Sequence, residues 1–172
     1  MMKELLLLRH AKSSWDDADL DDFDRPLAPR GLDAAPLMGK AIAARGWLPQ
    51  TALVSPSLRT RETWKLVSAQ SPRFVQPTFR DTLYEASAGQ LLAEVRHASE
   101  EITSLLLLGH NPGMQDFATL IAGESSDSTA LQQLRKKFPT AGLARLEFNG
   151  KWDELRAGAA RLSHFLRPKD LG

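Results

Sequence analysis

The chain contains no cysteine among its 172 residues, which excludes disulfides, thiolate catalysis and Cys-ligated zinc. Long apolar runs are also missing. The run Leu5–Leu8 near the start is shorter than the roughly 7–15 residues of a signal-peptide core and the roughly 20 of a membrane span. An excess of charge of either sign is absent too, because the net charge is only +1. We therefore expect a cytoplasmic protein that binds neither nucleic acid nor membranes, with any anion site built locally.

Several ligand-binding motifs are absent as well. The sequence has neither G-x-x-x-x-G-K-[ST] nor G-x-G-x-x-G, so nothing indicates a nucleotide fold. Its four histidines lack the short spacing of a zinc site. The pair Asp22-Phe23-Asp24 has the D-x-D spacing of some magnesium-dependent phosphatases, but it follows an acidic loop rather than an apolar strand. We interpret the loop 16–24 as solvated surface, and we expect no metal ion and no cofactor.

Short apolar runs alternate with segments of helical periodicity along the chain. The runs Leu5–Leu8, Ala52–Val54 and Leu105–Leu108 are typical of parallel strands buried on both faces. Helical spacing covers residues 33–45, 59–69, 89–99 and 114–122. This order predicts an α/β fold, and no linker divides the chain, so residues 1–172 are expected to form a single domain.

Two later segments, Leu143–Phe148 and Arg161–Leu166, alternate apolar and polar residues. They predict a hairpin-like pair near an edge of the sheet. His164 alternates with Leu162 and Leu166, so we expect it to share their face and to be partly buried. The segment Glu124–Thr129 is predicted to be a polar loop.

Basic and imidazole side chains follow the three apolar runs. Arg9 and His10 come after the first run, Gly109 and His110 after the third, and Arg59 lies just beyond the second. Ligands of open α/β sheets bind outside the carboxyl ends of the strands, so these side chains are expected to face one crevice. Two guanidinium groups suit the oxygens of a phosphoryl group, and a neutral imidazole can act as a nucleophile.

The full set of motifs resembles the histidine phosphatase superfamily. Arg9-His10, SPSLRTRET at 55–63, LYE at 83–85 and GHNPGM at 109–114 occur in the order of that superfamily's motifs. The stretches HAKSSWDD and RPLAPRG are similar to those of SixA-type protein phosphohistidine phosphatases. This resemblance covers essentially the whole chain and implies a phosphoglycerate-mutase-like, three-layer α/β/α sandwich with a mostly parallel central sheet.

The resemblance also implies a role for each site residue. His10 would attack phosphorus and become phosphohistidine, while Arg9, Arg59 and His110 would bind the phosphoryl oxygens. Glu85 would act as general acid and then as general base. The neighbouring guanidiniums should lower the pKa of His10.

Position 16 departs from one branch of the superfamily. The phosphoglycerate mutases carry asparagine there, whereas this chain has Asp16. A carboxylate would repel phosphate, so Asp16 either points away or is a second candidate for the general acid. Lys12 and Trp15 lie near the expected pocket mouth and are candidate substrate contacts.

The leading hypothesis is a metal-independent phosphatase that removes the phosphoryl group from phosphohistidine on a protein. A second hypothesis is a phosphatase for small phosphate monoesters using the same pocket. A third, from another class, is a phosphate-binding or phosphoprotein-binding module without turnover. The sequence does not indicate the oligomeric state.

Overall fold

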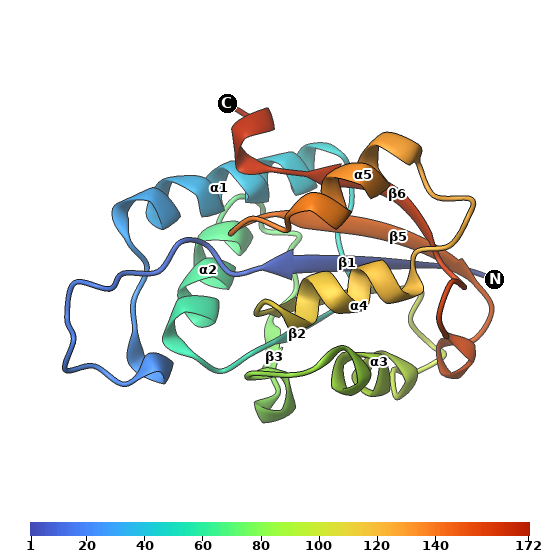
Figure 1. Ribbon diagram of the computed structural model, residues 1–172, viewed down its shortest axis with the longest axis horizontal. Helices are drawn as coiled ribbons and strands as arrows, with labels where there is room; N and C mark the ends of the chain where they lie inside the picture. The colour runs from blue at the N-terminus through green and yellow to red at the C-terminus, as the bar shows by residue number, and fades with distance from the viewer.

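A six-stranded sheet runs through the middle of the molecule (Figure 1). The computed structural model describes all residues, 1–172. The strands are β1 (Met2–Arg9), β2 (Thr51–Val54), β3 (Pro77–Phe79), β4 (Ser104–Gly109), β5 (Leu143–Asn149) and β6 (Arg161–Leu166). Their spatial order is β3-β2-β4-β1-β5-β6. The first four of these pair in parallel, and β5 runs antiparallel to both of its neighbours. The prediction of a mostly parallel sheet is confirmed.

The leucines of β1 divide between two hydrophobic cores. Leu5 and Leu7 face one core, whereas Leu6 and Leu8 face the other, and all four are at most 2% exposed. Side chains alternate between the faces of a strand, so an unbroken leucine run requires cover on both sides. Burial of each such side chain contributes about 1.5–3 kcal/mol.

Helices supply this cover on both faces, so the sandwich has three layers (Figure 1). The helices are α1 (Pro29–Ala44), α2 (Leu58–Ser68), α3 (Ala88–Arg96), α4 (Gly113–Ile121) and α5 (Ser128–Lys136). The core on one face contains residues of α1 and α2, and the core on the other contains residues of α3, α4 and α5. None of these helices is long and apolar enough to cross a bilayer. The predicted α/β/α fold is confirmed.

The sequence analysis missed two elements. Strand β3 has only three residues and no buried side chain, so it carries no apolar run that would reveal it. Helix α5 begins inside the segment predicted to be a loop, where the side chain of Asp127 accepts a hydrogen bond from the backbone N–H of Ala130. Only two of its residues are buried, which leaves a weak apolar signal. Four 3₁₀ turns complete the fold: η1 (Asp22–Asp24), η2 (Asp81–Leu83), η3 (Trp152–Glu154) and η4 (Pro168–Asp170).

Strands β5 and β6 form the predicted antiparallel pair at one edge of the sheet. The expected burial of His164 is wrong, however. The register shifts after the Arg145–His164 pair, so that Leu146 pairs with Leu162. Because of this bulge, Leu162 and Leu166 pack against different cores, and His164 lies exposed with its ring 4.8 Å from that of Trp47, measured between centroids.

The first turn of α1 packs directly against the backbone that follows β1. The N–H of Ala28 donates to the carbonyl of Lys12 at 2.8 Å. A Cβ atom added at Gly31 would fall on that same carbonyl oxygen. Gly31 therefore allows α1 to approach the segment next to His10 closely.

We predict that Gly31→Ala destabilises the protein by about 1–3 kcal/mol, because either α1 or the backbone at Lys12 must move. Urea unfolding would measure this loss. The matched control is Gly89→Ala in α3, where the new Cβ meets only the Ser87 hydroxyl at 3.9 Å. That control should be neutral or stabilising by about 0.5–1 kcal/mol. Equal stability of the two variants would contradict the proposed packing constraint.

Candidate active site

The tips of three neighbouring strands converge on one crevice. Arg9, at the end of β1, pairs in register with Gly109, at the end of β4. The N–H of His10 donates to the carbonyl of Gly109 at 3.1 Å, so the strands stay together beyond their last paired residues. On the other side of β4, the N–H of Ser55 donates to Leu108 at 3.0 Å. This arrangement places the segments after β1, β4 and β2 side by side.

His10 has a free lone pair on Nε2. Its Nδ1 lies 2.7 Å from the carbonyl oxygen of Ala11. Because a carbonyl only accepts, Nδ1 must carry the proton. Burial lowers the pKa of His10 to about 3, and the charges of Arg59 and Arg9 act in the same direction, although the hydrogen bond to Ala11 opposes them. His10 is therefore a neutral imidazole at pH 7, with Nε2 available as a nucleophile.

His110 lies beside His10, with 5.3 Å between the ring centroids. Its Nδ1 is 3.2 Å from a guanidinium nitrogen of Arg59, and its Nε2 is 2.7 Å from the Ser55 hydroxyl. A guanidinium only donates, so Nδ1 accepts and Nε2–H donates to Ser55. Burial and the charge of Arg59 lower the pKa of His110 to about 4. His110 is therefore neutral and directs a lone pair toward Arg59.

Arg59 is buried at the start of α2 and is held by the acidic loop. Its guanidinium donates to the backbone carbonyl of Asp22 at 2.7 Å and to the carboxylate of the same residue at 3.0 Å. Tyr84 donates to that carboxylate at 2.6 Å, and Arg25 donates to it at 2.9 Å. Burial alone would raise the pKa of Asp22, but these hydrogen bonds lower it to about 2.

The interpretation of Asp22 as part of a solvated turn is therefore incomplete. Its side chain remains partly exposed, at 44%, but it orients Arg59 and links the loop to the LYE motif. The neighbouring Phe23 packs edge-on against Tyr84, with 5.2 Å between the ring centroids. The spacing of residues along the chain did not indicate this role. The one available signal was chemical: a buried arginine needs an acceptor.

Arg9 is positioned from the opposite side of the crevice. Its guanidinium donates to the carbonyl of Phe138 at 2.9 Å, and the side chain of Asn111 donates to the same carbonyl at 3.0 Å. The Nε–H of Arg9 is buried without a partner. Burial and the charge of Arg59 lower the pKa of Arg9. Arg9 forms no ion pair within the chain, so its charge remains available for an anion.

Glu85 lies at a second side of the same crevice. It lines a cavity of about 560 Å³ together with Asp22, Arg59 and His110. Its φ of 55° is uncommon for a residue other than glycine and occurs most often where other contacts impose it. The start of α4 presses on this loop, since a Cβ at Gly113 would fall on the carbonyl oxygen of Ala86.

The remaining candidates lie further out. Lys12 is exposed and lines a separate basic cavity together with Arg9. Trp15 is 72% exposed, and its ring covers the guanidinium of Arg25 at 3.3 Å from the centroid. Asp16 is exposed and lines neither cavity, while its N–H donates to the Ser14 hydroxyl. The structure thus brings Arg9, His10, Arg59, His110 and Glu85 together and leaves Trp15 and Asp16 outside.

This geometry agrees with a family comparison, because residues 5–127 match the model of the histidine phosphatase superfamily (branch 1). The chain belongs to that superfamily. This histidine phosphatase is 33% identical, over 163 residues, to the uncharacterised protein Rv1276c of Mycobacterium tuberculosis; the match covers 94% of this chain and 100% of the relative.

Solved structures support the same assignment. A candidate phosphohistidine phosphatase SixA from Nakamurella multipartitia is 28% identical, with a TM-score of 0.85 over 98% of this histidine phosphatase and 97% of that chain. A phosphoglycerate mutase from Bacillus anthracis is 15% identical and shares the fold alone, with a TM-score of 0.66 over 94% of this chain and 92% of its own. The SixA-like, phosphoglycerate-mutase-like fold is confirmed, and the enzyme is a phosphatase.

We predict that His10 stays neutral from pH 8 down to about pH 4 in the folded enzyme, because its pKa is lowered to about 3. The pH dependence of the imidazole ¹⁵N and ¹³C shifts would measure the pKa of His10. The reference is the protein in concentrated urea, where histidines titrate at about pH 6.5. The unfolded chain then binds more protons between these values, so the free energy of unfolding falls as pH drops from about 6.5 toward 3. A His10 pKa at or above about 6.5 in the folded enzyme would contradict this.

Proposed function

We propose that this phosphatase removes the phosphoryl group from phosphohistidine on a protein, through a covalent intermediate on Nε2 of His10 and without a metal ion. The observation that carries the proposal is the state of His10. It is a buried, neutral imidazole whose proton is held on Nδ1 and whose lone pair lies among the charges of two guanidiniums. Phosphoryl transfer depends mainly on positioning and on neutralising the equatorial oxygens.

In the first step, the lone pair on Nε2 of His10 forms a bond to phosphorus. The P–N bond of the substrate breaks, and its electron pair goes to the leaving imidazole nitrogen. Glu85, as a carboxylic acid, supplies a proton to the leaving group. Arg9 and Arg59 hold the phosphoryl oxygens, with Arg59 kept in place by Asp22.

In the second step, water attacks phosphorus while the Glu85 carboxylate accepts a proton from it. The P–Nε2 bond breaks, its electron pair returns to His10, and inorganic phosphate leaves. His110 enters this scheme through its protonation state. A phosphoryl dianion offsets the arginine charges that lower the pKa of His110. Nδ1 then gains a proton and donates to a phosphoryl oxygen.

Two features favour phosphohistidine on a protein over a small ester. The cavity at Glu85 opens to solvent, with Glu85 and Asp116 exposed on its wall, so a bulky substrate can approach. The Nakamurella structure, described as a candidate phosphohistidine phosphatase, covers almost the whole chain. Metal independence is supported by the buried guanidinium of Arg59 and the half-buried guanidinium of Arg9, which supply the positive charge that a cation would otherwise provide.

We predict that a phosphodonor labels the wild-type enzyme in EDTA with an acid-labile, base-stable phosphoryl group that is then lost by hydrolysis. His10→Ala should abolish this label, because no other imidazole presents a free Nε2 to the crevice. Acid-sparing gel analysis and ³¹P NMR would detect it. The matched control is His97→Ala, which removes an exposed histidine at the end of α3.

Labelling that persists in His10→Ala would refute the proposed nucleophile. Tight phosphate binding with no label in the wild type would indicate a binding module instead. Activity that is lost in EDTA and restored by Mg²⁺ would refute metal independence. If the enzyme hydrolyses small phosphate esters but not a phosphohistidine protein, it is a phosphatase for small phosphate monoesters.

A comparison of substrates with different leaving groups tests whether Glu85 is the general acid. We predict that Glu85→Gln lowers kcat by about 10²–10⁴-fold for an alkyl phosphate, which needs a proton on its leaving oxygen. The loss should be much smaller for p-nitrophenyl phosphate, whose leaving group departs unprotonated. Asp16→Asn is the matched control and should lose little with either substrate, because Asp16 lines neither cavity. The reverse pattern would identify Asp16 as the acid.

A further inference from the structure

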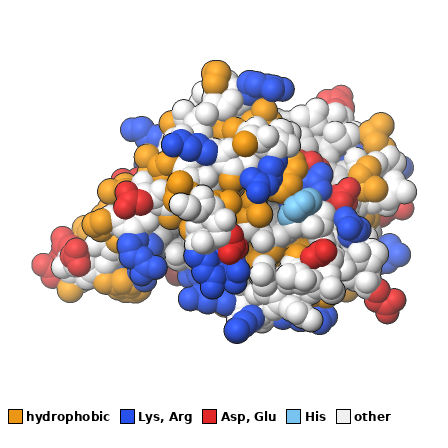
Figure 2. Space-filling model, turned by 90° about the horizontal axis from the view of Figure 1, so that it is seen from above, with side chains coloured by type: hydrophobic (Ala, Val, Ile, Leu, Met, Phe, Trp, Pro, Cys, Tyr) orange, Lys and Arg blue, Asp and Glu red, His pale blue; other side chains and the backbone are white.

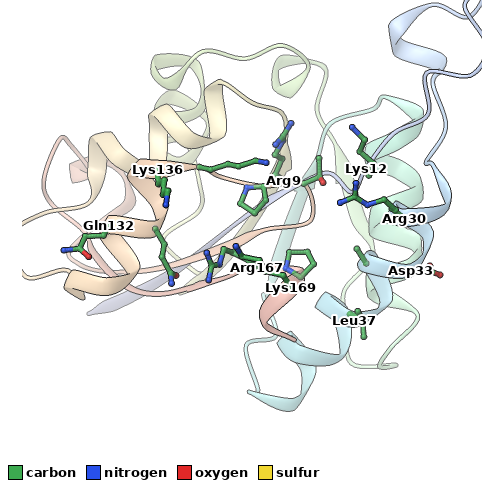
Figure 3. A pocket seen from close by; sticks show the side chains of 15 residues that line it. Arg9, Lys12, Arg30, Asp33, Leu37, Gln132, Lys136, Arg167 and Lys169 are labelled. Carbon is green, nitrogen blue, oxygen red and sulfur yellow. The ribbon is translucent and has the colours of Figure 1, made fainter. Parts of the chain in front are cut away.

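A large basic cavity adjoins the phosphoryl site on the side of Arg9 (Figure 3). It has a volume of about 1240 Å³. Seven cationic side chains line it: Arg9, Lys12, Arg30, Lys136, Lys137, Arg167 and Lys169. Only one acidic residue, Asp33, lines it as well. In Figure 3 the carboxylate of Asp33 points away from the group of cations.

Four separate parts of the chain contribute to this cavity. They are the end of β1 with the segment that follows it, the first turns of α1, the end of α5 with the residues that follow it, and the segment after β6. Figure 3 shows Lys136 on one side of the cavity, with Lys12 and Arg30 on the other side. Such convergence is notable because the net charge of the whole chain is only +1. The remainder of the molecule is therefore net acidic.

The charges in this cavity are not neutralised within the protein. Of the seven cations, only Arg167 forms an ion pair, with Asp170 at 2.8 Å. Elsewhere, buried basic residues have partners: Lys3 pairs with Glu100 at 3.3 Å, and Arg59 pairs with Asp22 at 3.0 Å. Uncompensated like charges repel one another, so an anionic ligand would gain free energy by entering.

On the opposite side of the phosphoryl site, the charged side chains are mostly acidic. The cavity at Glu85 is lined by Asp22, Glu85 and Asp116, with Arg59 as its single cation. Figure 2 shows further acidic side chains at the tip of the molecule, over the loop between β1 and α1. A substrate with acidic groups next to its phosphoryl group would therefore be oriented over the basic cavity and away from Glu85.

We propose that the basic cavity binds a carboxylate-rich segment of the phosphorylated protein, next to the histidine that carries the phosphoryl group. This inference rests on the proposed function. The volume exceeds the roughly 300–1000 Å³ of common small-molecule pockets. Most of the side chains that line the cavity are charged or polar. Exposed lysine tips adapt to the spaced carboxylates of a peptide segment.

Two synthetic peptides of equal length test this binding directly. Each carries one unphosphorylated histidine, flanked by glutamates in one peptide and by glutamines in the other. Fluorescence anisotropy at low salt should show the glutamate peptide binding about tenfold more tightly, with a preference that shrinks as salt rises. Equal affinity of the wild-type enzyme for the two peptides would overturn the proposal.

Variants locate the binding on this face of the molecule. Lys136→Glu combined with Lys169→Glu should abolish the preference for the glutamate peptide, and Lys136→Gln should reduce it. The matched control is Lys65→Glu, which reverses an exposed charge in the last turn of α2, outside the cavity. A preference that survives the double variant would overturn the proposal. If tripolyphosphate binds in this cavity and the glutamate peptide does not displace it, the cavity binds a small polyanion and the proposal is overturned.

Turnover separates this inference from the proposed function. With the same peptides phosphorylated on histidine, kcat/KM should favour the glutamate peptide by the factor seen in binding. If the wild-type enzyme binds the glutamate peptide selectively but hydrolyses neither phosphopeptide, the proposed function is refuted. The proposed binding role of the cavity then still stands. If both phosphopeptides bind equally and are hydrolysed at equal rates, the proposed function stands and the proposed role of the cavity is refuted.

Discussion

The pairing of β1 with β4 in register is the constraint on which the site depends. It sets Arg9 opposite Gly109, so the two histidines that follow these residues leave the sheet side by side. The pairing is strong because the leucines of both strands are buried on both faces. A slip of one residue would exchange the side chains between the two cores and would separate the imidazoles. Core packing and site geometry are thus determined by the same contacts.

Electrostatics then sets the chemistry of this crevice. Burial and two guanidiniums lower the pKa of His10 and His110 to about 3 and 4, so that both imidazoles are neutral at pH 7. The repulsion between the cations is tolerated because Asp22 balances Arg59, whereas Arg9 has only the carbonyl of Phe138. In the proposed mechanism, an arriving phosphoryl group would supply the negative charge that the crevice lacks.

Much of the fold could be predicted because its signals are local. The leucine runs identified β1 and β4, and the alternating segments identified the β5–β6 edge. Elements with few buried residues gave no such signal, so β3 and α5 were missed. The bulge after Arg145 also lay beyond prediction, because an extra residue in one strand depends on its partner strand. It separates Leu162 from Leu166, which were expected on one face, and places them against different cores.

The features of the site were likewise only partly predictable from the sequence. Residue types after the predicted strands were enough to name Arg9, His10, Arg59 and His110 as candidates, whereas Glu85 was named only through the resemblance of its LYE motif to the superfamily. The tautomers of the two histidines, the hold of Asp22 on Arg59 and the basic cavity became visible only in three dimensions. Each depends on contacts between segments far apart in the chain. Hydrogen bonds and charge effects act through space, and their strength depends on distances and burial that only the folded chain defines.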